Sequence, residues 1–251
     1  MRKLARAGVC VVLLACVACI GNAFAAGACE QEVERATNTL SRIYQEWPLH
    51  AVNDNVDAAV QAIASNIAAR AGISNLRRWR THIVRDFNLN AFSIGDGHIF
   101  ITEGMLQFIN NDAELAALIA HEFGHHLAGH FCRAGNHRRG FWSAFFGSDD
   151  NDDNQPPQAR KQVGSLTALV DPEMEREADR IGVNILKKAG LDAHAALTLA
   201  IRMAKSDSNA HFQYAHRIDA LKELLANAPH QPTNAQNAAA FQKMKRALSE
   251  R

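Results

Sequence analysis

Hydrophobic positions recur at the spacing of a helix in two stretches near the start of the chain, residues 30–47 and 56–69. Two shorter runs favour strands: residues 79–88, and residues 98–102, which follow two turn-forming glycines. Most of the remaining chain has helical character. The pattern therefore predicts an α+β domain that is mainly α, with one small β-sheet.

A further helix is expected between residues 111 and 127, and it is apolar on almost every side. Asn111 is a suitable N-cap, with Glu114 in the position of its capping-box partner. Helices of this composition are usually buried, yet this one carries the sequence H-E-x-x-H at residues 121–125. One explanation is a pair of core histidines whose nitrogens are satisfied by backbone carbonyls.

The H-E-x-x-H motif also has a chemical use. Residues four apart share a helix face, so His121 and His125 can bind the same Zn²⁺. Glu122 then lies beside the open position of the metal, where its carboxylate can take a proton from bound water. The motif predicts a catalytic zinc site with Glu122 as its general base.

Two more histidines follow the motif, His126 and His130. No glutamate follows His126, and on a continuous helix His130 would lie about 140° around the axis from His125. The chain also lacks the glycine at position 128 and the histidine at position 131 that metzincins use. We therefore expect both histidines to be helix-surface residues or to support the ligands, and the third ligand to come from elsewhere.

A second acidic segment supplies candidates for that ligand. Asp171 is a suitable N-cap, and Pro172 suits the first turn of a helix. Glu175 and Asp179 are four residues apart and share a face. One carboxylate can complete a His-His-Glu zinc site, and the other can accept a hydrogen bond from a ligand histidine. The alternative is an ordinary acidic first turn, which the helix dipole favours.

In this order and spacing, the two motifs resemble those of the M48 peptidases, which are zinc gluzincins. The resemblance extends to residues 90–106, which are similar to the family's strand and turn before the metal helix, and it covers residues 50–225 or so. It implies a zincin-like metalloprotease domain with a small β-sheet beside the metal-binding helix. An extended substrate could add to the edge of that sheet as a strand.

The same resemblance implies a role for each matching residue. His121, His125 and Glu175 bind one Zn²⁺ per chain, and Glu122 is the general base. Asp179 supports the site by orienting a ligand; a role as proton donor is the alternative.

One further family element is partly matched. The family often has Thr-His-Pro followed by an arginine five residues beyond the proline; His211 and Arg217 match, whereas Ala210 and Phe212 depart from it. By resemblance, His211 approaches the metal, where it would stabilise the oxyanion or occupy the fourth zinc position and keep the enzyme latent. Arg217 would pair with an active-site carboxylate or bind substrate; a surface arginine is the alternative.

The N-terminus has the organisation of an export signal. Arg2, Lys3 and Arg6 precede an uncharged stretch that ends in an A-x-A cleavage signal at residues 23–25. Cleavage there removes three positive charges, so the formal net charge falls from +1 to −2, which argues against nucleic acid as a partner. We expect a periplasmic protein; the alternatives are an uncleaved anchor and a lipid anchor at Cys16, which ends a lipobox-like sequence.

The mature chain is expected to form one protease domain over residues 26–228, followed by a tail at residues 229–251 that contains a short helix. No second apolar run long enough to span a bilayer follows the signal peptide of residues 1–25. Cleavage would leave Cys29 and Cys132. An even pair in an exported protein suggests a disulfide, and two free thiols are the alternative.

Residues 140–158 form the clearest loop. The aromatic cluster at residues 141–146 is expected to pack in the core; a lid or a patch that touches the membrane is the alternative. The acidic run that follows does not fit an EF-hand, because Asn154 and Arg160 stand where glycine and glutamate are needed.

Together these features predict an exported zinc endopeptidase that hydrolyses peptide bonds in protein or peptide substrates. Exported or misfolded envelope proteins are the expected class of substrate or partner by family analogy. A rival function is a zinc-stabilised, chaperone-like binding protein with a closed, latent site. Glu122 argues against that rival, because a purely structural zinc site has no use for a general base.

Overall fold

The structure is a computed structural model that describes residues 28–52, 54–132, 171–206 and 215–250. In chain order its elements are α1 (Glu30–Glu46), α2 (Asn55–Arg70), β1 (Arg80–Val84), β2 (Ala91–Gly95), β3 (His98–Thr102), α3 (Glu103–Phe108), α4 (Asp112–Leu127), α6 (Pro172–Ala189), α7 (His194–Lys205), α8 (Ala215–Leu225) and α9 (Ala235–Ser249). The fold is mainly helical with one small sheet, which confirms the predicted α+β class. The strand expected at residues 98–102 is β3, and the one expected at residues 79–88 is the shorter β1.

The three strands form one sheet in the order β1-β3-β2. β1 runs parallel to β3 and β2 runs antiparallel to it, so Phe100 of β3 is in register with His82 on one side and Phe92 on the other. Asp96 and Gly97 join β2 to β3 with positive φ angles of 48° and 84°. Such a two-residue turn matches the natural twist of paired strands.

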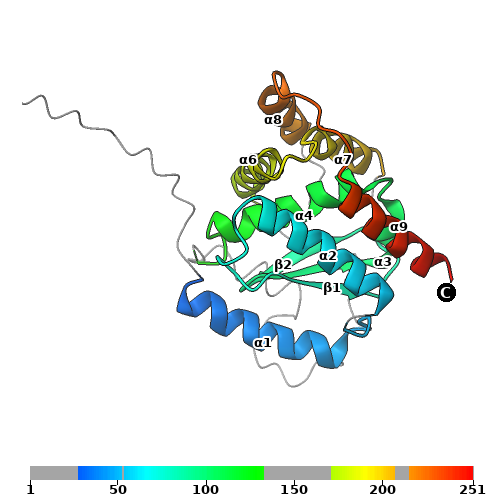
Figure 1. Cartoon of the computed structure of the whole chain (residues 1–251). Helices are drawn as coiled ribbons and strands as arrows, with labels where there is room; N and C mark the ends of the chain where they lie inside the picture. The colour runs from blue at the N-terminus through cyan, green and yellow to red at the C-terminus, as the bar shows by residue number, and fades with distance from the viewer. Residues whose placement is uncertain (1–27, 53, 133–170, 207–214, 251) are drawn as a thin grey trace, which may run out of the picture.

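Alternation along the strands separates two hydrophobic cores, one on each face of the sheet. The face toward α1 carries the smaller core, whose buried residues are Ile43, Val84, Phe92, Ile94 and Phe100. The larger core joins the opposite face to α2, α4 and the helices beyond them. Figure 1 shows these layers: α1 lies on one side of the sheet, α2 and α4 on the other, and α6, α7 and α8 beyond α4.

The C-terminal segment that was expected to contain a short helix forms α9, which packs along α2 (Figure 1). Phe241 and Met244 enter the larger core. Lys245 donates hydrogen bonds of 2.9 Å to the backbone carbonyls of Leu106 and Gln107 in α3. This helix therefore docks on the domain itself.

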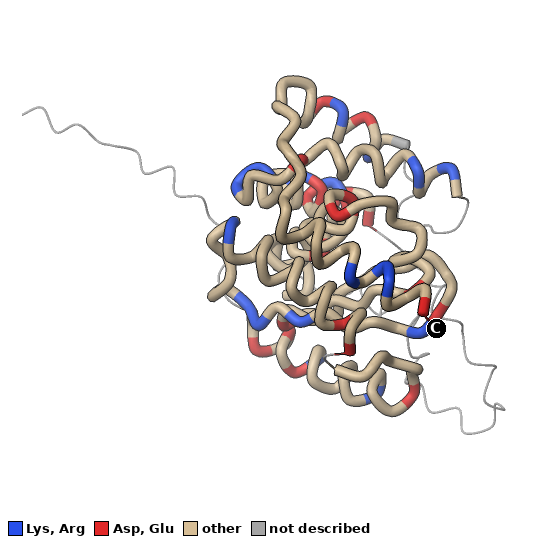
Figure 2. The backbone as a smooth tube through the Cα atoms, turned by 45° about the vertical axis from the view of Figure 1, so that its right-hand side comes forward, with Lys and Arg blue, Asp and Glu red and all other residues tan. Residues whose placement is uncertain are grey.

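Several predicted features lie outside the described residues: the export signal with Cys16, the loop at residues 140–158 with its aromatic cluster, and His211. Among the helices that the structure describes, none has both the length and the apolar character that crossing a membrane requires. Lys, Arg, Asp and Glu positions are interspersed along α1, α6 and α8 (Figure 2), so neither sign of charge dominates these helices.

Candidate metal centre

Helices α4 and α6 cross at close range because a glycine stands on each side of the crossing. A Cβ atom on Gly124 of α4 would overlap the backbone of Ala178, and one on Gly182 of α6 would lie 3.0 Å from the carbonyl oxygen of Ala120. The face of α6 that carries Gly182 also carries Glu175, two helical turns earlier. The crossing therefore brings the acidic face of α6 onto the H-E-x-x-H segment of α4.

Both helices begin at the predicted caps. Asn111 accepts a hydrogen bond from the backbone N–H of Glu114, and Asp171 accepts one from the backbone N–H of Glu173, each at 2.9 Å. The Glu114 carboxylate accepts a hydrogen bond from the backbone N–H of Asn110 at 2.9 Å. In the predicted capping box this carboxylate would accept from the N–H of the N-cap, Asn111. It accepts instead from the residue before the cap.

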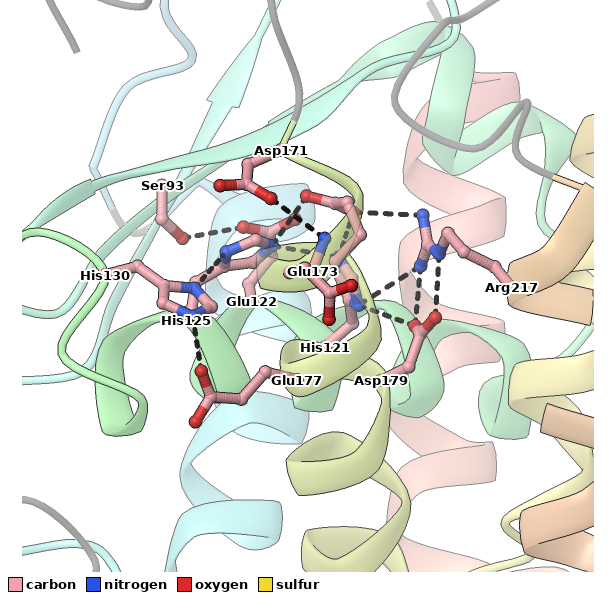
Figure 3. A network of polar contacts seen from close by, with 11 residues as sticks. Ser93, His121, Glu122, His125, His130, Asp171, Glu173, Glu177, Asp179 and Arg217 are labelled. Atoms are coloured by element: carbon pink, nitrogen blue, oxygen red, sulfur yellow. Dashed lines mark hydrogen bonds and ion pairs between the residues drawn. The ribbon is translucent and has the colours of Figure 1, made fainter. Parts of the chain in front are cut away.

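His121, His125 and Glu175 converge at the crossing, and Figure 3 labels the two histidines. One nitrogen of each histidine and one carboxylate oxygen of Glu175 all lie within 4.8 Å of one another. The two Nε2 atoms are 3.1 Å apart, and each is 3.3 Å from an oxygen of Glu175. Two imidazole nitrogens and one carboxylate are the donor set of a catalytic zinc site with three protein ligands. These residues therefore fit Zn²⁺.

Asp179 lies behind His121, on the side away from the candidate ligand atoms. Its Oδ1 is 2.9 Å from Nδ1 of His121, which leaves Nε2 to face His125 and Glu175. A carboxylate in this position holds a ligand histidine in one tautomer and one orientation. The contact favours the orienting role for Asp179 over that of proton donor.

Arg217 reaches the carboxylate of Asp179 from α8 (Figure 3) and also contacts that of Glu175. Its Nε and Nη2 lie 2.7 and 2.6 Å from the two oxygens of Asp179, and its Nη1 lies 3.0 Å from Oε2 of Glu175. Only 2% of Arg217 is exposed, so the surface-arginine alternative is wrong. Its contacts match the predicted pairing with active-site carboxylates.

This arrangement shifts the protonation of the buried groups. Burial by itself would lower the pKa of His121, but its hydrogen bonds with Asp179 and Glu175 outweigh burial and raise the pKa to about 9. Burial would raise the pKa of Asp179, but the charge of Arg217 and the contact with His121 lower it to about 2. Burial lowers the pKa of His125. Without metal, His121 is therefore positively charged at neutral pH, whereas His125 is neutral.

Glu122, the predicted general base, is buried beside these candidate ligands and is hydrogen-bonded to a residue of the sheet. Ser93 of β2 donates a hydrogen bond from Oγ to Oε2 of Glu122 at 2.8 Å. Ser93 was not among the predicted site residues. Strand alternation places it on the face opposite Phe92, but which helix covers that face is a property of the tertiary fold.

His126 and His130 are both fully buried, so the expectation of a helix-surface position is wrong for both. For His130, that expectation assumed a helix that continues to residue 130. α4 ends earlier, and Gly129 turns the chain with a φ of +68°. His130 therefore comes back against His125, with their Nδ1 atoms 2.9 Å apart, whereas His126 points toward α1.

Two other predicted features have different outcomes. His211 lies outside the described residues, so its position relative to the candidate zinc ligands stays a prediction. Cys29 precedes α1 and Cys132 follows α4, and their Cα atoms are 5.9 Å apart. That separation lies within the range that disulfides span.

Comparison with known proteins agrees with this geometry. The model of peptidase family M48 matches residues 54–233. The chain is 33% identical over 146 residues to mitochondrial metalloendopeptidase OMA1 of Schizosaccharomyces pombe, an alignment that covers 57% of this chain and 43% of the relative. It is 31% identical over 153 residues to the Arabidopsis thaliana protein of the same name, with 58% and 30% covered.

A bacterial relative is the putative beta-barrel assembly-enhancing protease of Vibrio cholerae. It is 27% identical over 146 residues, which cover 49% of this chain and 28% of the relative. The chain thus spans less than half the length of each of these curated relatives.

Proposed function

Because this chain belongs to peptidase family M48, we propose that it is a zinc-dependent endopeptidase that hydrolyses peptide bonds in protein substrates. One observation carries the proposal: His121, His125 and Glu175 present three ligand atoms within 4.8 Å of one another, and Glu122 stands next to the first of them. A nitrogen-and-oxygen site with three protein ligands keeps a position for water or substrate. These residues would hold one Zn²⁺ per chain.

The zinc ion, when bound, supplies a Lewis acid that lowers the pKa of water and polarises a substrate carbonyl. Glu122 is the base in this chain: its carboxylate takes a proton from the attacking water and delivers it to the leaving amine. Ser93 holds the Oε2 atom of that carboxylate through the 2.8 Å hydrogen bond and so restricts its rotation. General base catalysis depends on such placement within hydrogen-bond reach.

Asp179 and Arg217 act through the ligands. Asp179 keeps the Nδ1 proton of His121 on the far side of the ring, so Nε2 is available for the metal. Arg217 balances the negative charge of Asp179 and Glu175 with a buried guanidinium. The guanidinium also helps to hold the pKa of Asp179 at about 2, so this carboxylate stays ionised beside His121.

The substrates are proposed to be exported proteins, with misfolded envelope proteins as the main class. The export signal at residues 1–25 supports a periplasmic location for the domain of residues 26–228. The bacterial relative's name refers to β-barrel assembly, which agrees with work on envelope proteins. The lipid anchor at Cys16 is the alternative way of holding the enzyme in the same compartment.

His211 is proposed to act on the same metal, either by stabilising the oxyanion or by closing the fourth zinc position. These two roles predict opposite results for His211→Ala. An enzyme that His211 keeps latent becomes more active, whereas loss of an oxyanion stabiliser lowers kcat. Cleavage of an unfolded protein substrate by the metal-loaded variant measures which role applies.

The test of the proposed function is Glu122→Gln, with zinc content and cleavage of an unfolded protein measured on the same sample. Retained zinc with lost cleavage supports the peptidase, since the variant removes the base and leaves all three ligands. Glu223→Gln makes the same chemical change on an exposed position of α8 and is the matched control. Unchanged cleavage in Glu122→Gln would overturn the proposal and leave the zinc-stabilised binding protein as the better account.

A further inference from the structure

His130 links the candidate ligand His125 to a carboxylate on the neighbouring helix. Nδ1 of His130 is 2.9 Å from Nδ1 of His125, and Nε2 of His130 is 3.2 Å from Oε2 of Glu177 (Figure 3). The His130 side chain is fully buried, and that of Glu177 is 29% exposed. The three groups form a chain that runs from the metal centre toward the surface of α6.

A backbone turn sets this arrangement. Gly129 has a φ of +68°, which reverses the chain at the end of α4, and the backbone N–H of His130 then donates to the carbonyl of His125 at 3.2 Å. The turn thereby places the imidazole of His130 against the end of α4, next to His125. Side chains other than glycine adopt such a φ only with strain.

With both rings neutral and Nε2 of His125 on the metal, the hydrogen bonds from His125 through His130 to Glu177 have one consistent assignment of donors and acceptors. Nε2 of His125 faces Glu175 and His121, so a neutral His125 that binds metal through Nε2 carries its proton on Nδ1. That N–H must donate to Nδ1 of His130, which is then an acceptor. The remaining proton of a neutral His130 is on Nε2, from which it donates to the Glu177 carboxylate.

We infer that His130 and Glu177 are positioning residues for His125, as Asp179 is for His121. The inference rests on the proposed function, because it assigns Nε2 of His125 to the metal. Both histidines of the motif then have a carboxylate of α6 behind them. For His121 the contact with Asp179 is direct, and for His125 it passes through the ring of His130. Such supporting contacts fix ring orientation and tautomer, and their loss weakens metal binding by about 10–100-fold.

The experiment measures zinc affinity in competition with a chromophoric chelator, using the folded full chain. His130→Leu removes the acceptor for His125 and is expected to lower the affinity about 10–100-fold. His130→Asn puts a carbonyl oxygen near the position of the lost Nδ1, so it should restore part of the affinity. Such rescue is not expected if His130 only fills space.

Glu177→Gln keeps an acceptor for His130 but removes the charge, and it is expected to lower the affinity less than His130→Leu does. Its matched control is Glu173→Gln, on the same helix but with a side chain that is 79% exposed. The control is expected to bind zinc like the wild type. An equal loss in both variants would point to the general charge of α6 and overturn the inference.

A second pair of variants acts only through the backbone. Gly129→Ala and Gly72→Ala introduce the same kind of strain, because both glycines have positive φ (+68° and +72°) and neither has an atom within 4 Å of an added Cβ. Only Gly129 holds His130 in place. Gly129→Ala is therefore expected to weaken zinc binding and to change the absorption spectrum of the Co²⁺-substituted protein, whereas Gly72→Ala changes neither.

The outcomes separate the inference from the proposed function. Thermal unfolding of the metal-free variants shows whether a variant has lost its fold; Glu177→Gln, at a partly exposed side chain, tests the inference even if His130→Leu unfolds. Wild-type affinity in His130→Leu and Glu177→Gln, beside a Glu122→Gln variant that binds zinc and does not cleave, overturns this inference alone. A wild-type chain that binds no zinc overturns both.

Discussion

Arg217 and Asp179 form a bidentate ion pair, with Nε 2.7 Å from Oδ2 and Nη2 2.6 Å from Oδ1. Arginine suits this place because its planar guanidinium matches both oxygens of a carboxylate at once. A third nitrogen remains for Glu175. The pair therefore joins α8 to the acidic face of α6 at the candidate metal centre.

Replacement of Arg217 by methionine is expected to destabilise the metal-free protein by about 3–5 kcal/mol, since it leaves buried carboxylates without their cation. Chemical denaturation of the metal-free chain measures this loss. Arg42→Met is the control, because the exposed Arg42–Glu46 pair contributes no more than about 0.5 kcal/mol. Equal losses in the two variants would contradict a structural role for the buried pair.

Gly124→Ala is expected to impair zinc binding and stability more than Gly182→Ala. The Cβ at position 124 would overlap the backbone of Ala178, so α4 and α6 must move apart, whereas the Cβ at position 182 meets the carbonyl of Ala120 at 3.0 Å. Overpacking of this kind costs about 1–3 kcal/mol. Zinc content and unfolding temperature are the measurements, and a Gly124→Ala protein with normal zinc affinity would refute the role given to the crossing.

Zinc affinity is expected to rise about tenfold per pH unit from pH 7 toward 9, with one proton released per metal. The metal must displace the proton that His121 holds with its pKa of about 9. The stability of the metal-free fold changes with pH in the opposite direction. The contacts that raise the pKa of His121 stabilise the metal-free protein fully below pH 6.5, and this stabilisation is lost as the pH rises through 9. Calorimetry in buffers of different ionisation enthalpy counts the protons. An affinity that levels off near pH 7 would show that His121 titrates normally.

We predict that Cys29 and Cys132 form a disulfide, which would close a loop between residues 103 positions apart. Peptide mapping with thiol alkylation detects the bond directly. Replacement of both cysteines by serine is expected to lower stability by about 2–4 kcal/mol. A reductant should lower the stability of the wild type to that of the variant and leave the variant unchanged; free thiols in the purified wild type would contradict the prediction.

Local sequence patterns were sufficient for the parts of the site that depend on helical spacing. The four-residue intervals of H-E-x-x-H and of Glu175 and Asp179 place each pair on one face, and the caps Asn111 and Asp171 mark where the two helices begin. The class of the fold follows from the same patterns, because helical periodicity covers most of the chain.

The residues that the sequence missed or left open depend on turns and on tertiary contacts. His130 was predicted either as a helix-surface residue or as a support for the ligands. Gly129 is the signal that could have decided between these roles, since a glycine soon after an apolar helix commonly ends it in a left-handed turn. Glu177 was part of an acidic segment, and nothing in its spacing pointed to a histidine on another helix. Ser93 required knowledge of which helix covers its face of the sheet.

Arg217 follows Asp179 by 38 residues, so α4 and α6 alone do not complete the charge network around the candidate ligands. Packing of α8 against α6 brings the guanidinium to Asp179 and Glu175. A folding intermediate in which α4 and α6 have crossed but α8 has not docked would therefore hold both carboxylates without their cation. The candidate metal centre is complete only when these three helices have packed together.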